Sequence, residues 1–237
     1  FDTGGEGGKR AVCFALALPP TLDPSALDGF FDDDVLLMMD NCPSQKVVWG
    51  DADILEARLE PLREKGLLAI RMPLSAPYHT PMFKPAVERF IGDYRSLNLG
   101  AGKVPLYSGL TGQPFPETQE EVIATATGQW SQPVQFHKTL TRMHDDGIRV
   151  FVDVGPAGRL AGFVRDSLQG RPHTALTLDE ETRNDGSALF RAIAHLFSLG
   201  AIDRVAHGAA TATGPAPSVL VEAPGPVATP AAALPAV

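Results

Sequence analysis

Residues 35–66 read VLLMMDNCPSQKVVWGDADILEARLEPLREKG, and this stretch decides the fold of the first part of the chain. Val35 to Met39 is an apolar run, and a polar turn containing proline separates it from a second run, Lys46 to Gly50. Two such runs around a short turn predict a pair of strands. A helix is expected next, over Ala52 to Lys65, because apolar residues recur there at helical spacing and Asp51 can cap its start.

The flanking residues extend this pattern in both directions. Ala11 to Leu18 predicts an earlier strand, Pro24 to Phe31 a short helix, and Leu67 to Leu74 a fourth strand. Pro61 should kink or split the helix in which it lies, since proline lacks an N–H and crowds the preceding turn. The resulting order βαββαβ within residues 11–74 is typical of a small ferredoxin-like subdomain.

The composition limits the class of protein. The chain has 237 residues, of which 44% are hydrophobic and 20% charged, and its formal net charge is −8. This charge argues against a nucleic-acid partner bound through its phosphates. No apolar run approaches the about 20 residues that span a bilayer, and the first residues do not resemble a secretion leader, so we expect no membrane contact and a cytoplasmic location.

No metal site is expected. The two cysteines lack the spacing of metal ligands and are too few for a disulfide framework. Three adjacent acids, Asp32 to Asp34, are interpreted as a solvated turn, since oxygen ligands need a spacing that lets them converge on the ion.

The rest of the chain divides into three segments by composition. Residues 1–10 are rich in glycine and charge and predict a flexible entry, whereas residues 205–237 are rich in Ala and Pro and predict a disordered linker. Residues 75–204 predict further α/β structure. Its expected elements are strands at Val104–Tyr107 and Arg149–Val154, helices at Glu117–Trp130, Val134–Asp145 and Ser187–Leu199, and a helix that ends at Leu168.

A histidine framed by prolines stands at the junction of two predicted elements. Pro73 and Pro77 keep the residues before them extended, and Pro85 suits the first turn of a helix. Such a position can hold His79 as a general base, because imidazole titrates near neutral pH. The alternative is a histidine that only satisfies a local hydrogen bond.

Four segments resemble, in the same order, the motifs of one family. Residues 74–90, LSAPYHTPMFKPAVERF, resemble the histidine motif of malonyl-CoA:acyl carrier protein transacylases and of the acyltransferase domains of polyketide and fatty-acid synthases. Residues 41–50 resemble the Asn-x-Pro-x-Gln-x-Val-x-x-Gly turn of that family. Residues 130–136 resemble its Pro-Val segment, and residues 151–156 its Glu-Val-Gly-Pro turn.

The resemblance implies a fold and roles for particular residues. The fold would be a small ferredoxin-like subdomain inserted into an α/β-hydrolase-like core, of which residues 75–204 would be the C-terminal part. His79 would act as general base, and the backbone carbonyl of Gln135 would orient its ring; otherwise Gln135 is a polar residue at a helix start. Tyr78 and Ala76 would line the acyl pocket. Asn41 would stabilise its turn through bonds to the backbone or would contact the substrate.

The resemblance also implies substrates and partners. The substrate would be a coenzyme A thioester carrying a malonyl-type group, and the acceptor would be phosphopantetheine on an acyl carrier protein, with no bound cofactor. Neighbouring synthase domains would be further partners, in polyketide, fatty-acid or antibiotic biosynthesis.

The nucleophile of the family does not occur in the sequence. Its serine lies in a Gly-His-Ser-x-Gly elbow, which is absent here. We therefore expect this chain to be the second half of the domain, cut from or paired with the missing N-terminal half, and to be inactive alone. The alternative is a non-catalytic module that docks the carrier protein or braces a synthase.

Overall fold

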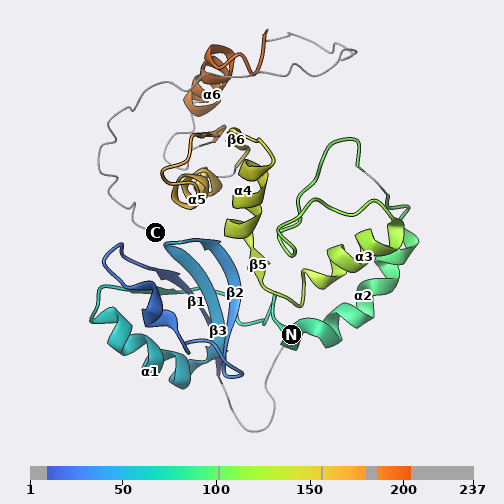
Figure 1. Ribbon diagram of the computed structural model, residues 1–237. Coiled ribbons are helices and arrows are strands. Elements are labelled where there is room, and N and C mark those ends of the chain that lie inside the picture. The colour runs from blue at the N-terminus through green and yellow to red at the C-terminus, as the bar shows by residue number, and fades with distance from the viewer. Residues whose placement is uncertain (1–9, 101, 156, 180–185, 204–237) are drawn as a thin grey trace.

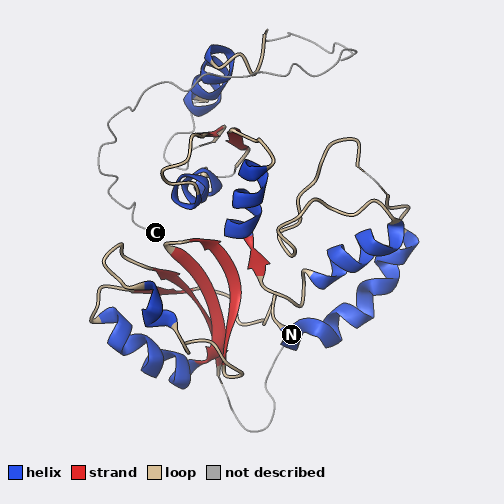
Figure 2. Cartoon of the chain, viewed as in Figure 1, coloured by secondary structure: helices blue, strands red, loops and turns tan. Residues whose placement is uncertain are grey.

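The first part of the chain is an antiparallel sheet with one helix on one face. The computed structural model describes residues 10–100, 102–155, 157–179 and 186–203 (Figure 1). The sheet has the strand order β4-β1-β3-β2-β5, and β5 pairs parallel to β2, as Figure 2 shows in red. The elements of this part are β1 (Ala11–Ala17), the 3-10 turn η1 (Pro24–Leu27), β2 (Val35–Cys42), β3 (Gln45–Asp51), α1 (Ala52–Arg63) and β4 (Leu68–Arg71).

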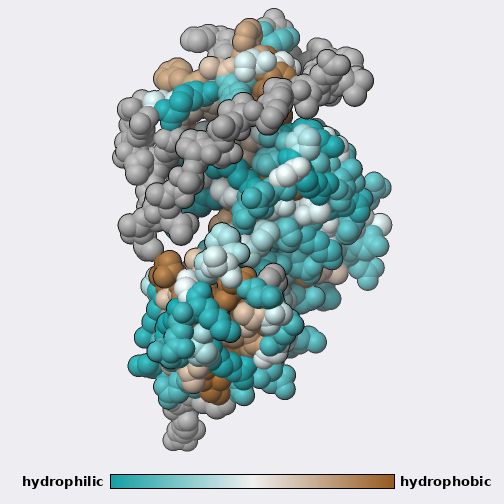
Figure 3. All heavy atoms as spheres, turned by 60° about the vertical axis from the view of Figure 1, so that its left-hand side comes forward, coloured by the Kyte–Doolittle hydropathy of each residue, from teal (hydrophilic) through white to brown (hydrophobic). Residues whose placement is uncertain are grey.

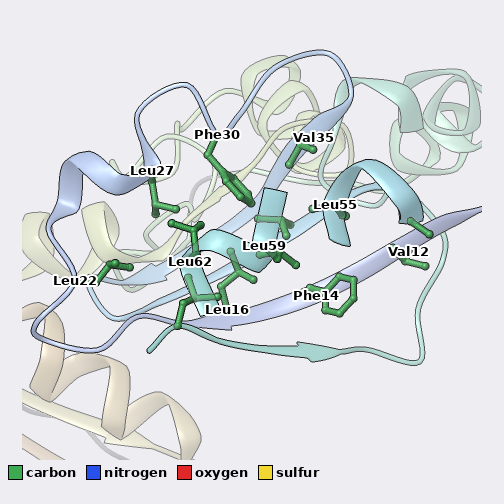
Figure 4. Close-up of a cluster of buried hydrophobic side chains, with 13 residues drawn as sticks. Val12, Phe14, Leu16, Leu22, Leu27, Phe30, Val35, Leu55, Leu59 and Leu62 are labelled. Carbon is green, nitrogen blue, oxygen red and sulfur yellow. The ribbon is translucent and has the colours of Figure 1, made fainter. Parts of the chain in front are cut away.

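Alternation along β1 assigns its side chains to the two faces of the sheet. Val12, Phe14 and Leu16 are buried beneath α1, where they meet Leu55 and Leu59 (Figure 4). Residues that alternate along a strand point to opposite faces, which places the side chains between them on the other side of the sheet. There a second buried cluster forms from Cys13, Met38, Val47 and Trp49.

Three expectations for this part need correction. Helix α1 is not split at Pro61. That residue lies in the last turn, two residues before Arg63, so the backbone hydrogen bond that proline cannot donate is missing only near the end of the helix. The helix expected over Pro24–Phe31 is a single 3-10 turn, η1, started by the Asp23 side chain, which accepts the Ser25 N–H. The fourth strand is shorter than the expected span Leu67–Leu74, because only Leu68–Arg71 (β4) pairs with β1.

The second part contains helices and a small parallel sheet. Strands β6 and β7 pair parallel, and α4 and α5 pack beside them around Leu140, Phe151, Val164 and Leu168. Helices α2 and α3 lie together on the other side of β5 (Figure 1). The elements are the 3-10 turn η2 (Pro81–Phe83), α2 (Lys84–Ser96), α3 (Gln119–Gly128), β5 (Val134–Gln135), α4 (Phe136–Asp145), β6 (Val150–Asp153), α5 (Arg159–Ser167), β7 (Thr174–Thr177) and α6 (Ser187–Ser198).

The second part also differs from expectation in its strands. The expected strand Val104–Tyr107 is reduced to a single bridge between Tyr107 and Pro114. The helix expected from Val134 starts at Phe136, because the two residues of β5 join the edge of the sheet at β2 instead. Strand β7 was not expected, since its polar sequence gives no clear alternation.

Helix α6 buries small residues most completely. Ala188 and Ala192 are buried, whereas Phe190 and Phe197 are 71% and 58% exposed. Figure 3 shows apolar atoms, in brown, at the surface in the region of α6. Of the four residues whose spacing predicts an apolar face, Ile193 and Leu196 are half-buried, whereas Leu189 and Phe197 are exposed.

Residues 1–9 of the expected entry and the expected linker 205–237 lie outside the described residues. Among the helices that are described, none has the length and apolar character needed to cross a bilayer.

Candidate active site

The turn before His79 is fixed by hydrogen bonds from two directions. The Trp49 indole N–H donates to the Ser75 carbonyl at 2.8 Å, which ties the turn to β3. The fully buried Thr80 donates its hydroxyl to the Pro77 carbonyl at 2.7 Å. The Tyr78 N–H donates to the Ala76 carbonyl at 2.9 Å, so the chain reverses just before the histidine.

His79 itself has a left-handed backbone. Its φ is +60°, and Ala157 is the only other residue besides glycine with a positive φ among those described. Histidine is among the side chains that tolerate this region, but the conformation still costs energy and persists only when its surroundings impose it. Part of that constraint is a bond from the His79 N–H to the Trp130 carbonyl at 2.8 Å.

The imidazole ring is oriented by the backbone carbonyl of Gln129, the residue before Trp130. Nδ1 of His79 lies 2.6 Å from this oxygen. A carbonyl can only accept, so Nδ1 carries the proton and Nε2 keeps its lone pair. Within the described part of the chain, Nε2 makes no hydrogen bond. The arrangement therefore leaves Nε2 as the ring nitrogen that is available for proton transfer.

The assignment of this carbonyl to Gln135 was wrong. Gln135 lies in β5, where its N–H donates to the Gly109 carbonyl and its carbonyl accepts the Thr139 hydroxyl at 2.8 Å. Gln129 is instead the C-cap residue of α3. The last carbonyls of a helix have no partner within the helix, and the predicted end of this helix was the signal that could have identified Gln129.

Aromatic rings surround the histidine. Trp130 lies nearly parallel to the imidazole, with 6° between the planes and 6.2 Å between the ring centroids. Phe90 meets the indole edge-on, and the indole N–H donates to the Tyr94 hydroxyl at 3.1 Å. These contacts bring α2 and the end of α3 together at His79.

Tyr78, an expected pocket residue, is half-buried between the two parts. Its ring lies 4.7 Å from that of Phe83 and packs against the buried cluster that includes Met38 and Trp49. Ala76 is half-buried in the same turn. One side of the Tyr78 ring is therefore occupied by protein.

Asn41 stabilises its turn differently from the expectation. Its side-chain amide donates to the Gln45 side chain at 2.5 Å, so the bond joins two side chains across the β2–β3 turn rather than reaching the backbone. No hydrogen bond links Asn41 to His79 within the described residues. The same turn is bound to α5 through Ser44 and Asp166, a contact that the sequence did not suggest.

The cysteines are unsuited to nucleophilic chemistry. Burial raises the pKa of Cys13 to about 11. Burial, together with the neighbouring Asp166 carboxylate, raises the pKa of Cys42 to about 12. A thiol acts as a nucleophile in its ionised form, so neither is a candidate. Within the described ranges, no cluster of His, Cys, Asp and Glu could hold a metal ion.

Known proteins share both sequence and fold with this chain. No protein-family model matches it. It is 28% identical over 181 residues to a malonyl CoA-acyl carrier protein transacylase of Bacillus subtilis, an alignment that covers 75% of this chain and 56% of that protein. It is also 28% identical to the polyketide biosynthesis acyltransferase homolog PksD of the same organism, over 55% of this chain and 39% of that protein.

Solved structures agree with the sequence relatives. The malonyl CoA-acyl carrier protein transacylase from Clostridium perfringens superposes with a TM-score of 0.66 at 23% identity, covering 83% of this chain and 60% of that one. The acyltransferase domain of SpnD superposes with a TM-score of 0.70 at 21% identity, covering 80% and 46%. The chain thus spans about half the length of the proteins it matches. It is a relative of the malonyl-CoA:acyl carrier protein transacylases and the polyketide synthase acyltransferases, with their mixed α/β fold.

Proposed function

We propose that this chain is part of an acyltransferase that moves a malonyl-type group from coenzyme A to an acyl carrier protein. The observation that carries the proposal is the orientation of His79, whose Nδ1 is bound by the Gln129 carbonyl and whose Nε2 has no hydrogen-bond partner among the described residues. The names of the sequence relatives, malonyl-CoA:acyl carrier protein transacylase and polyketide acyltransferase, support the reaction class.

His79 would serve as the base in both half-reactions. Nε2 takes the proton of a serine hydroxyl as the serine oxygen attacks the thioester carbonyl. The C–S bond then breaks, and the coenzyme A thiolate receives that proton from the imidazolium. In the second half, Nε2 takes the proton of the phosphopantetheine thiol, whose sulfur attacks the serine ester. The serine oxygen leaves and is protonated again. The serine is expected in a Gly-His-Ser-x-Gly elbow outside this chain.

We assign residues 11–74 to the ferredoxin-like subdomain of such an enzyme and residues 75–204 to part of its α/β-hydrolase-like core. The strand order β4-β1-β3-β2 and its antiparallel pairing support the first assignment. The parallel pair β6–β7 supports the second, because parallel strands belong to sheets covered by helices. The partners are the carrier protein, the remaining half of the core and neighbouring synthase domains.

Replacing His79 by alanine in the parent domain, with the serine elbow restored, tests the proposal. Acylation of the protein by malonyl-CoA, followed by intact mass, should slow by about 10²- to 10⁴-fold, the loss typical of a general base. His195→Ala is the matched control, because His195 is exposed on α6. An acylation rate for His79→Ala within a few fold of that control would refute the assignment.

The chain alone provides a second measurement. We expect no covalent acyl adduct after incubation with malonyl-CoA, since the cysteines are held in their neutral form. If the parent protein binds carrier protein but is never acylated, the docking alternative replaces the catalytic one.

A further inference from the structure

We propose that Tyr94 and Trp130 form a positioning pair that holds the His79 imidazole in its Nδ1–H form. The inference rests on the proposed function for its importance in catalysis, but its geometry concerns this chain alone. Tyr94 lies outside the motifs identified in the sequence, Trp130 opens the segment that resembles the Pro-Val motif, and neither residue has so far been given a role in the reaction.

His79 depends on the backbone of residues 129 and 130 for its position and orientation. The Gln129 carbonyl is bound to Nδ1 at 2.6 Å, and the Trp130 carbonyl accepts the His79 N–H at 2.8 Å. Two successive carbonyls therefore set both the ring orientation and the backbone position of His79. A shift of this short segment would disturb both bonds together.

The backbone N–H groups of residues 129–131 are bound only by long hydrogen bonds, of 3.1 to 3.3 Å, to carbonyls at the end of α3. Gln129 is the C-cap of α3, and the Trp130 N–H reaches the Thr127 carbonyl at 3.2 Å, close to the limit of a normal bond. The chain leaves the helix at this point, and helix ends fray. The side chain of Trp130 supplies the additional support.

Tyr94, on helix α2, fixes the indole ring of Trp130 by a hydrogen bond. The indole N–H of Trp130 donates to the Tyr94 hydroxyl on α2 at 3.1 Å, and Phe90, one turn earlier, meets the indole edge-on with 5.9 Å between the ring centroids. Helix α2 itself begins at Lys84, five residues after His79. The turn, α2, the indole and the histidine thus form a closed loop of contacts.

The closed loop matters because His79 is strained. Its positive φ would relax if its surroundings loosened. A free imidazole can place its proton on either nitrogen, and the bound carbonyl selects Nδ1. Removing the Tyr94 hydroxyl leaves the indole N–H without its partner. The backbone of residues 129 and 130 then moves more, and the hydrogen bond between the Gln129 carbonyl and Nδ1 of His79 is formed for a smaller fraction of the time.

The test is Tyr94→Phe in the full 237-residue chain, with the His79 tautomer read from long-range ¹H–¹⁵N NMR spectra. We expect the ratio of Nε2–H to Nδ1–H to rise between about 2-fold and 10-fold, the range of one hydrogen bond. Tyr107→Phe is the matched control, because it removes an equivalent hydroxyl bonded to Asp146 at 2.8 Å, far along the chain from the turn. The control should lower stability without changing the tautomer.

A double variant separates positioning from general loosening. In Trp130→Phe the indole N–H is gone, so adding Tyr94→Phe should change the tautomer ratio no further. An unchanged ratio in Tyr94→Phe, or the same change in Tyr107→Phe, would overturn the inference. If the tautomer experiment fails, the expected effect of His79→Ala on acylation still stands. Conversely, a normal acylation rate in His79→Ala would overturn the proposed function but would not change the tautomer result.

Discussion

Ser44 and Asp166 are bound to each other by two hydrogen bonds across 122 positions of the chain. The N–H of Ser44 donates to Oδ2 of Asp166 at 2.9 Å, and its hydroxyl donates to the same oxygen at 2.8 Å. Burial works against ionisation of this carboxylate, but the bonds from Cys42 and Ser44 outweigh it and lower the pKa of Asp166. The β2–β3 turn is thereby attached to α5.

Replacing Asp166 by alanine should lower the free energy of unfolding by about 1.5 to 3 kcal/mol, the range for hydrogen bonds to a charged group. Ser44→Ala should cost less, since its N–H still donates. Denaturant unfolding measures both, and the double variant should cost less than the sum of the two because they share one contact. Asp145→Ala removes an exposed ion pair with Arg171 and should cost less than about 1 kcal/mol. Equal losses for Asp166→Ala and Asp145→Ala would contradict this view of the contact.

Tyr78 should favour malonyl over methylmalonyl in the parent protein. Pro77 restrains the backbone, and Phe83 and the Trp49 cluster occupy one side of the ring, so the ring can yield little room for a methyl group. Tyr78→Ser should narrow the preference, which for one methyl amounts to about 10- to 200-fold. Competition between the two thioesters measures it. Equal use of both by the unaltered protein would rule out a gating role for Tyr78.

Two glycines of the α5 region should respond in opposite ways to alanine. Gly158 has φ +64°, and a Cβ there would lie 2.8 Å from the Asp179 carbonyl oxygen, so Gly158→Ala should cost about 1 to 3 kcal/mol or more. Gly162 lies within α5 with open space around it, and Gly162→Ala should stabilise the chain by about 1 kcal/mol. Thermal unfolding of the two variants is the comparison, and a shift of both in the same direction would not fit the structure.

The free energy of unfolding should decrease at acidic pH, in part because the Asp32 carboxylate becomes protonated. The Arg58 guanidinium, with help from the N–H groups of Asp34 and Val35, lowers the pKa of Asp32 to about 2. A carboxyl whose pKa is lowered on folding contributes stability above its unfolded pKa of about 3.9, and loses it as the pH falls toward 2. Asp32→Asn should make the decline between these values shallower, as measured by denaturant unfolding at several pH values. Asp33→Asn, one residue further on, should leave the decline unchanged; an equal effect of both would exclude the Arg58 contact as its cause.

The first part of the fold was predictable because its order follows from local patterns. Val35–Cys42 and Gln45–Asp51 are strands close to their expected bounds, and Asp51 caps α1 as predicted. The two strands are apolar runs around a short turn and pair with each other, and the helix carries its capping residue. Strand β7 was missed because its four residues, Thr174–Thr177, take their strand form from pairing with β6.

The site was predictable at His79 and not at the residues that hold it. Proline framing marks His79 in the sequence, whereas the contact with Gln129 joins residues 50 positions apart. The sequence indicated where this helix ends, but the contact also depends on how the helix end packs against the distant turn, which no local pattern predicts. The error at Gln135 arose in the same way, since that residue belongs to an edge strand.

The pairing of β5 with β2 has a consequence for the order of folding. Met39 pairs with Val134, and closing so long a loop costs more entropy than forming the hairpin of β2 and β3. Contacts between distant residues form slowly, so we expect the first four strands and α1 to fold before β5 docks. Gln129 and Trp130 stand just ahead of β5, so we expect them to reach His79 when that strand docks. The histidine therefore acquires its proton-accepting arrangement late, after the sheet that supports its turn has already formed.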